Sequence, residues 1–111
     1  MKEFSIHGVR VPITPDEVSA EIWAALRSGR YEANEARRVP RAIQPGDRVL
    51  ELGAGLGIIT SIIARIEDVR VWSFEADPQT TQLAKRVIDL NCSENVILAH
   101  GILAAGPPRT R

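Results

Sequence analysis

The chain has 111 residues, of which 44% are hydrophobic and 25% are charged, as in an ordinary soluble domain. Its 14 basic and 14 acidic residues give a net charge of zero, so charge provides no reason to expect a nucleic acid or an anionic membrane as partner. The apolar runs are too short to cross a bilayer, the first residues lack the apolar core of a secretory signal, and the single cysteine cannot form an internal disulfide, which together favour the cytoplasm.

The beginning of the chain predicts an arm followed by a helix. Residues 4–13 alternate weakly and fit a short strand or an arm. Thr14 can cap a helix, Pro15 suits its first turn, and Glu17 completes a capping box. Four apolar residues then share one helical face: Val18, Ile22, Trp23 and Leu26. Gly29 is a typical end of such a helix.

The rest of the chain alternates strands and helices. A charged helix is expected from residue 31 to about residue 39, where Pro40 interrupts it. Buried strands are expected at 48–53, 69–75 and 96–100, with helices at 58–66 and 78–91 between them. Short helices between apolar strands predict an α/β fold with a Rossmann-like parallel sheet, here incomplete with about three strands and N-terminal helices. The expected organisation is an N-terminal arm and helix (1–30), a partial cofactor-binding domain (31–103) and a disordered tail (104–111).

A glycine-rich loop lies where the first of these strands meets its helix. Gly53 and Gly55 allow a tight turn against which a ligand can lie, and Gly57 allows the helix to pack close to the strand. The dinucleotide fingerprint needs a glycine where this chain has Ile58. The carboxylate of Glu51 would oppose a pyrophosphate and favour a cationic group such as an ammonium, although it fits equally well as a structural cap of nearby backbone N–H groups.

An acidic residue ends the second strand. Glu75 lies 22 positions after Gly53, a spacing at which a carboxylate accepts hydrogen bonds from ribose hydroxyls. This contact serves NAD and S-adenosylmethionine alike. Asp77 is the rival for the role, but the chain turn beside it predicts that it caps the next helix. At the end of the third strand, we expect Gly101 and Ile102 to pack on adenine.

Three stretches of the chain resemble class I S-adenosylmethionine-dependent methyltransferases: VLELGAGLGIITSIIA, VWSFEADP and NVILAHGIL. The likeness is greatest to the FkbM-type family, whose members mainly methylate oxygen, and it covers residues 29–103. The resemblance implies S-adenosyl-L-methionine as the cofactor, and Glu32 resembles a family glutamate that lies close to the amino acid end of that cofactor. Eight residues are expected at the cofactor: Glu51, Gly53, Ala54, Gly55, Glu75, Ala76, Gly101 and Ile102.

The implied reaction is methyl transfer to an oxygen nucleophile of a small molecule or a glycan, achieved mainly by placing that nucleophile in line with the methyl group. A complete domain of this class has more strands than these three, so we expect a truncated chain that is inactive alone, and no catalytic residue can be assigned. His7 and His100 lack metal-ligand spacing. The alternatives are a non-catalytic remnant or interaction module, and an NAD(P)-binding oxidoreductase fragment. The uncovered first strand predicts a homodimer through its edge, or aggregation.

Overall fold

The computed structural model describes residues 3–92 and 94–101. The chain begins with a hairpin, in which β1 (Phe4–Ile6) pairs antiparallel with β2 (Val9–Val11). His7 and Gly8 connect the two strands, and both have positive φ angles, 51° and 79°. Two such residues in succession match the right-handed twist of a tight hairpin. The sequence predicted a short strand or an arm here, whereas the structure has two short strands joined by a turn.

The helix expected to begin at Thr14 is divided into two parts. A 3₁₀ helix at Pro15–Glu17 carries the expected capping box, and the chain is then extended at Val18. Ser19 starts α1 (Ala20–Ser28), because its hydroxyl accepts a hydrogen bond from a backbone N–H of the first turn. The expected start was wrong because two capping residues lie five positions apart and the second one begins the α-helix.

The end of α1 and the interruption at Pro40 were predicted from local signals. Gly29 ends α1 with a φ of 77° and donates its N–H to the last turn. α2 (Ala33–Arg38) follows, and a 3₁₀ helix at Val39–Ala42 replaces its continuation at Pro40, which has no N–H to donate.

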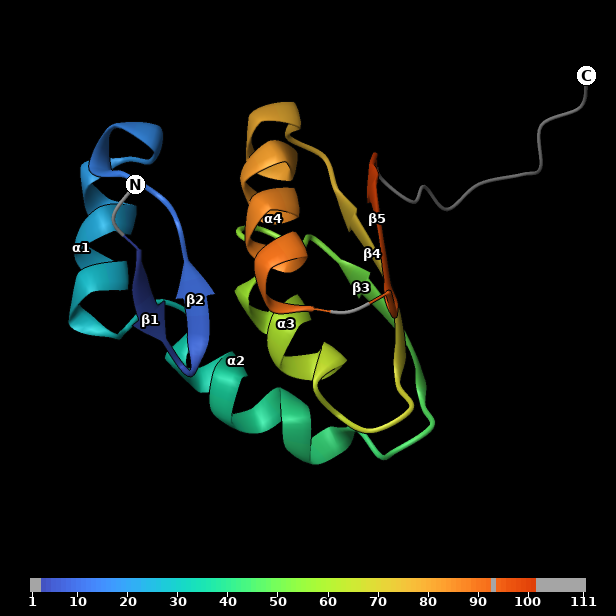
Figure 1. The fold of residues 1–111 in the computed structure, drawn as a ribbon. Coiled ribbons are helices and arrows are strands. Elements are labelled where there is room, and N and C mark those ends of the chain that lie inside the picture. The colour runs from blue at the N-terminus through green and yellow to red at the C-terminus, as the bar shows by residue number, and fades with distance from the viewer. Residues whose placement is uncertain (1–2, 93, 102–111) are drawn as a thin grey trace, which may run out of the picture.

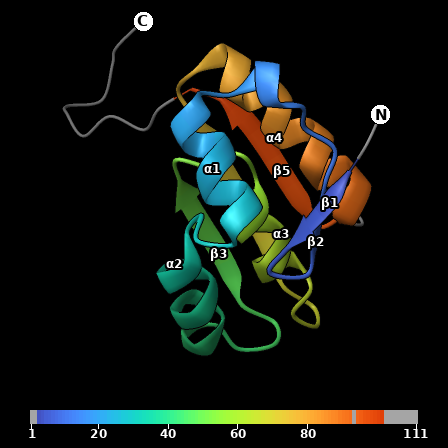
Figure 2. The ribbon, with the colours of Figure 1, turned by 90° about the vertical axis from the view of Figure 1, so that its left-hand side faces the viewer.

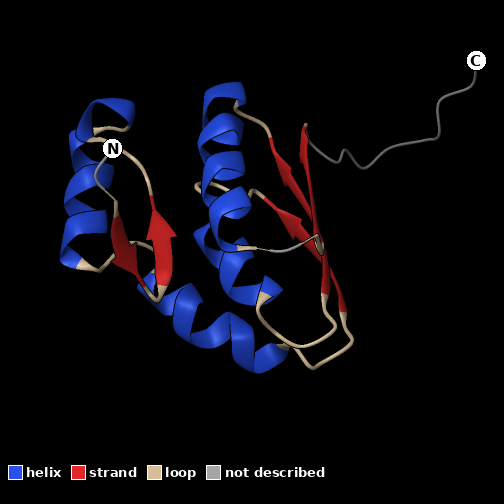
Figure 3. Ribbon diagram, viewed as in Figure 1, coloured by secondary structure: helices blue, strands red, loops and turns tan. Residues whose placement is uncertain are grey.

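A parallel sheet forms the second half of the fold. Its elements are β3 (Arg48–Leu52), α3 (Ile58–Ala64), β4 (Arg70–Glu75), α4 (Pro78–Asn91) and β5 (Val96–His100), and the strand order is β3-β4-β5. Both pairs are parallel, as expected for strands joined by helical crossovers. The Rossmann-like α/β arrangement predicted from the sequence is confirmed (Figures 1 and 3).

All the described helices lie on one side of this sheet, as Figures 1 and 2 show. The other face carries apolar side chains in register, with Leu50 beside Trp72 and Trp72 beside Ile97. Leu50, Leu52 and Ile97 are 57%, 62% and 58% exposed. No helix in residues 3–92 and 94–101 is long and apolar enough to cross a membrane.

Two hydrophobic clusters hold the layers together. One joins the N-terminal hairpin and α1 to the glycine loop, α3 and α4, and consists of Ile6, Val9, Val11, Ile13, Leu26, Leu56, Ile58, Leu83 and Val87. The other lies between α3 and the sheet, and consists of Ile59, Ile63, Val69 and Val71. Residues between Ile6 and Leu26 therefore share a core with the glycine loop, α3 and α4.

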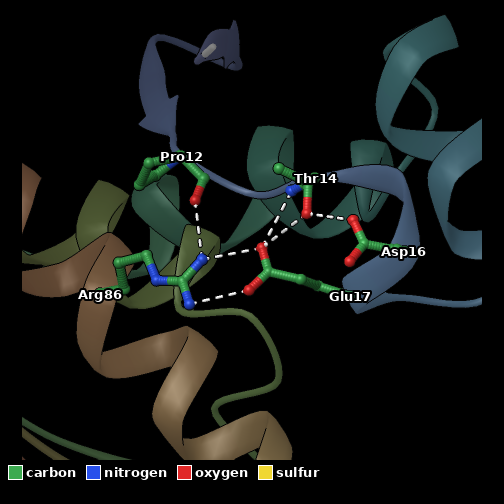
Figure 4. A network of polar contacts seen from close by, with 5 residues as sticks. All are labelled: Pro12, Thr14, Asp16, Glu17 and Arg86. Atoms are coloured by element: carbon green, nitrogen blue, oxygen red, sulfur yellow. Dashed lines mark hydrogen bonds and ion pairs between the residues drawn. The ribbon is translucent and has the colours of Figure 1, made fainter. Parts of the chain in front are cut away.

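A polar contact also fixes the N-terminal segment to α4 (Figure 4). The guanidinium of Arg86 donates to both carboxylate oxygens of Glu17, at 2.8 Å each, and to the carbonyl of Pro12 at 3.0 Å. The hydrogen bond from Arg86 and the backbone N–H of Thr14 lower the pKa of Glu17 to about 2. This paired geometry is the strongest that a guanidinium and a carboxylate form.

Candidate functional site

The glycine loop crosses the carboxyl ends of the strands. The N–H groups of Gly53 and Ala54 both donate to the carbonyl of Phe74, at 2.8 and 2.9 Å, and so tie the loop to β4. Gly53 has a φ of 85°, and a Cβ added there would meet no atom within 4 Å. Its backbone is therefore open on the side where a side chain would stand, which leaves room for a ligand to approach.

Gly57 is needed for a different reason from the one expected. A Cβ at this position would lie 3.0 Å from the carbonyl oxygen of Ala84 and 3.0 Å from Cγ1 of Ile88. Both belong to α4, so the missing side chain lets the start of α3 pack against a helix, not against the strand. Sequence reasoning identified the close approach but named the wrong partner.

Glu75 connects the end of β4 to the glycine loop. Its Oε1 accepts a hydrogen bond from the N–H of Gly55 at 2.8 Å, and its Oε2 accepts one from Asp77 at 3.1 Å. Asp77 itself accepts from the N–H of Thr80 at 2.7 Å and caps α4, as the sequence predicted. Each carboxylate oxygen has more than one lone pair, so Glu75 retains capacity for further donors.

Glu51 lies deeper, beneath the loop. Its Oε1 accepts hydrogen bonds from the hydroxyls of Thr60 and Ser73, both of which are fully buried. Burial raises the pKa of Glu51, the two hydroxyls lower it, and the charge of Glu75 raises it. The alternative structural reading expected backbone N–H donors, whereas the observed partners are side-chain hydroxyls. Only the short spacing from Glu51 to Thr60 was visible in the sequence.

Glu32 lies opposite Glu51 and is held in an unusual conformation. It precedes α2 with a φ of 48°, in the left-handed region that few residues other than glycine adopt. Its Oε1 is buried and has no hydrogen-bond partner among the described residues. Burial raises the pKa of Glu32 to about 7, with further contributions from the charges of Glu35 and Glu51.

A cavity of about 330 Å³ lies between α2 and β3. Its carboxylates are those of Glu32, Glu35 and Glu51, and Gly53 of the loop lies on its wall. Its apolar lining comes from Val39, Val49, Leu50, Leu52, Ile59 and Ile63. A larger hollow of about 790 Å³ lies at the amino ends of the strands, around residues 64–70, and shares no residue with the glycine loop. The smaller cavity includes Gly53 and therefore belongs to the candidate site. A further cavity of about 220 Å³ lies beside Tyr31, Leu56 and Asp77.

Tyr31 closes the site on the side of the N-terminal segment. Its hydroxyl would lie 3.4 Å from a Cβ placed on Gly55. Burial raises the pKa of Tyr31 to about 12, aided by the charges of Glu32 and Glu75 and opposed by a backbone hydrogen bond from Leu56. The phenol therefore stays protonated at neutral pH and keeps a donor beside the loop. No sequence signal indicated this role of Tyr31, because the role depends on contacts between distant segments.

The end of β5 completes the edge. The N–H of Gly101 donates to the carbonyl of Glu75 at 2.8 Å, and the ring Nε2 of His100 lies 3.0 Å from the carbonyl oxygen of Ala76. Ile102 lies outside the described residues. The structure thus brings seven of the eight expected residues to the carboxyl edge of the sheet: Glu51, Gly53, Ala54, Gly55, Glu75, Ala76 and Gly101.

The chemistry of this edge suits a ligand with hydroxyls and positive charge. Open backbone at Gly53, a carboxylate at the end of β4 and a buried unpartnered carboxylate oxygen fit a nucleoside joined to an ammonium group. A pyrophosphate would lie close to these carboxylates and be repelled by them. The geometry therefore fits S-adenosylmethionine better than NAD.

Comparison with known proteins agrees with this assignment. The family model of the TRM5/TYW2 methyltransferase domain matches residues 20–103. The ribosomal protein L11 methyltransferase of Bacillus cytotoxicus is 26% identical over 90 residues, which are 78% of this chain and 29% of that protein. This chain therefore spans less than a third of the length of that relative.

Two solved structures show the same fold. Trm5b from Pyrococcus abyssi superposes with a TM-score of 0.69 over 89% of this chain and 27% of that one, at 23% identity. The N-terminal domain of EvdMO1, with S-adenosylhomocysteine bound, superposes with a TM-score of 0.55 over 62% of this chain and 29% of that one, at 29% identity. The matches confirm the methyltransferase class and its cofactor, S-adenosylmethionine, but they do not confirm the FkbM-type family. The chain belongs to the TRM5/TYW2 methyltransferase domain family of class I S-adenosylmethionine-dependent methyltransferases.

Proposed function

We propose that this chain binds S-adenosylmethionine at the carboxyl edge of its sheet and forms the cofactor side of a methyl-transfer site. The observation that carries the proposal is the hydrogen bond from Gly55 to Glu75, which joins the glycine loop to the acidic strand end at 2.8 Å. Glu75 accepts the ribose hydroxyls, and the open backbone of Gly53 lies under the cofactor. Ala54, Ala76 and Gly101 supply the surrounding backbone.

The residues of this chain bind and orient the cofactor. The bound cofactor supplies a methyl group on a positively charged sulfur. Glu75 fixes the ribose, and the carboxylates of Glu32 and Glu51 attract the cationic end of the ligand. Tyr31 lies over Gly55 of the loop, and Leu56, itself a loop residue, anchors the loop in the first hydrophobic cluster. Such placement is the main source of rate in a transfer that needs a nucleophile in line with the methyl group.

For the acceptor, we propose an oxygen atom on a small molecule or a glycan. The support is the resemblance to FkbM-type proteins. A ribosomal protein is the competing acceptor, favoured by the likeness to the enzyme of Bacillus cytotoxicus. Incubation of the protein with tritiated cofactor and separate pools of metabolites, glycans and ribosomal proteins distinguishes the two. Label in the ribosomal protein pool alone contradicts the oxygen proposal, and no label in any pool agrees with a chain that is inactive alone.

Calorimetric titration with S-adenosylhomocysteine and with NAD tests cofactor binding. We expect binding of the first and none of the second. Gly53→Ala and Gly29→Ala form a matched pair, since both glycines have positive φ angles, 85° and 77°, and neither would bring a Cβ within 4 Å of another atom. Both variants should lose about 1 kcal/mol of folding free energy to backbone strain, but only Gly53→Ala should weaken binding. Equal affinity in the two variants would show that the glycine loop does not contact the cofactor.

A further inference from the structure

The cavity between α2 and β3 contains a carboxylate whose environment does not suit its charged form. Glu32 Oε1 is buried without a hydrogen-bond partner in the described part of the chain, and the backbone at Glu32 is held in the left-handed region. An unpartnered buried acceptor is costly, and strained backbone persists only where the surrounding structure imposes it. Both features are typical of a residue prepared for a ligand.

The charged groups that act on Glu32 come from two elements. Glu35 lies on the same helix, α2, and Glu51 lies on β3 across the cavity; both raise the pKa of Glu32. Tyr31 stays protonated and so adds no charge, and Glu75 acts on Tyr31 from β4. Among the described residues, the charges that act most strongly on Glu32 are thus negative. Protonation is the simplest way to remove the repulsion between these charges and Glu32.

Glu51 is the poorer candidate for holding that proton. Its Oε1 accepts from the hydroxyls of Thr60 and Ser73, and these donors stabilise its charged form. No residue in the described part of the chain donates to Oε1 of Glu32. Of the two carboxylates, Glu32 is the one whose charge depends on what enters the cavity.

We propose that Glu32 is protonated in the ligand-free chain and releases this proton to solvent when the ammonium group of the cofactor enters the cavity beside Glu51. This rests on the function proposed above. The ammonium keeps its own proton, so the exchange replaces one buried proton by one buried cation and leaves the charge of the cavity unchanged. Cofactor binding is therefore coupled to pH, and ligands that lack the amino acid end bind without this coupling.

The test is calorimetric titration of the full chain with S-adenosylhomocysteine in buffers of different ionisation enthalpy, from pH 5 to pH 8. With a pKa of about 7 for Glu32, proton release should approach one per ligand at pH 6 and fall toward zero at pH 8. The affinity should rise by up to about tenfold per pH unit below pH 6.5 and level off toward pH 8. 5′-Methylthioadenosine, which has the nucleoside but no ammonium, should bind without proton release.

Two variants locate the exchanging group. Glu32→Gln should abolish the proton release and flatten the pH profile, whereas Glu35→Gln should keep the release and move its midpoint to lower pH. Binding of S-adenosylhomocysteine without proton release, or full release in Glu32→Gln, overturns the inference and leaves cofactor binding intact. Absence of binding at every pH overturns both. If Glu32→Gln does not fold, the unmodified chain still tests the inference, because S-adenosylhomocysteine should release a proton on binding and 5′-methylthioadenosine should not.

Discussion

Glu75 combines two tasks in one carboxylate. It holds the glycine loop through Gly55 and the chain turn through Asp77, while its remaining lone pairs face the ligand in the function we propose. Glu75→Ala should weaken binding of S-adenosylhomocysteine by roughly ten- to a hundredfold, because a hydrogen bond to a charged group contributes about 1.5–3 kcal/mol. Calorimetry measures the loss.

The control for this variant is Glu94→Ala, which removes an exposed carboxylate beside the hollow at the opposite end of the strands. Its affinity should equal that of the unmodified chain. An unchanged dissociation constant in Glu75→Ala would show that the ribose contact is made elsewhere.

Glu17 makes the stability of the chain sensitive to acid. Its pKa in the folded chain is about 2, below the ordinary value of 4.5, so its stabilising effect is complete above pH 4.5 and is lost as the pH falls toward 2. Its side chain is 24% exposed and that of Arg86 36%, so we expect an effect of about 1 kcal/mol after solvent screening. Urea denaturation of Glu17→Gln should show this deficit at pH 7 and none at pH 2. A deficit that persists at pH 2 would assign the effect to packing instead.

At the scale of elements, the start of α3 depends on a single missing side chain. Gly57→Ala would place a Cβ 3.0 Å from the backbone of α4 at Ala84, in addition to the strain of a φ of 79°. We expect a loss of about 2 kcal/mol or more in folding free energy, compared with about 1 kcal/mol for Gly29→Ala, where only the strain applies. Thermal denaturation of the two variants compares these costs, and equal melting temperatures would mean that α3 and α4 separate easily.

The elements that the sequence predicted well are those with strong local signals. α4 begins at Pro78 after the cap at Asp77 and ends at Asn91, as expected, because its start signals and its apolar face lie within the helix itself. The parallel direction of the strands follows from two helical crossovers and was also predicted. The start of α1 was wrong because Thr14 and Ser19 compete as caps, and local preference does not decide between them.

The parts of the site that were not predicted depend on contacts between distant segments. The glycine loop and Glu75 share a recognisable spacing, so both were found. The hydroxyls that hold Glu51, the tyrosine over Gly55 and the missing partner of Glu32 arise only when α2, α3 and β4 are packed together. No spacing in the sequence encodes that packing.

At the scale of the whole molecule, the sheet is covered on one side only by the described residues. Leu50 and Leu52 of β3 are more than half exposed, beside a strand edge that has no neighbour among residues 3–92 and 94–101. Such an edge and face promote association. We expect the chain to self-associate at micromolar concentration, and Leu52→Lys to shift it toward monomer.

Sedimentation velocity of the two proteins, with hydrogen exchange at residues 48–52, measures this association. Gln82→Lys is the charge control, because it adds a positive charge at an exposed position of α4, away from β3, and it should leave the association unchanged. A monomer whose amides at 48–52 are strongly protected would contradict the exposed edge.

The shared core also extends beyond the region that the family model matches. The family match begins at residue 20, yet Ile6, Val9, Val11 and Ile13 lie before that point and are at most 4% exposed. A shortened chain that begins at residue 20 would leave the inner surfaces of α3 and α4 facing water, including Leu56 at the glycine loop. The boundary of sequence similarity is therefore not a boundary of folding: the hairpin is as much a part of the cofactor loop's support as the helices that follow it.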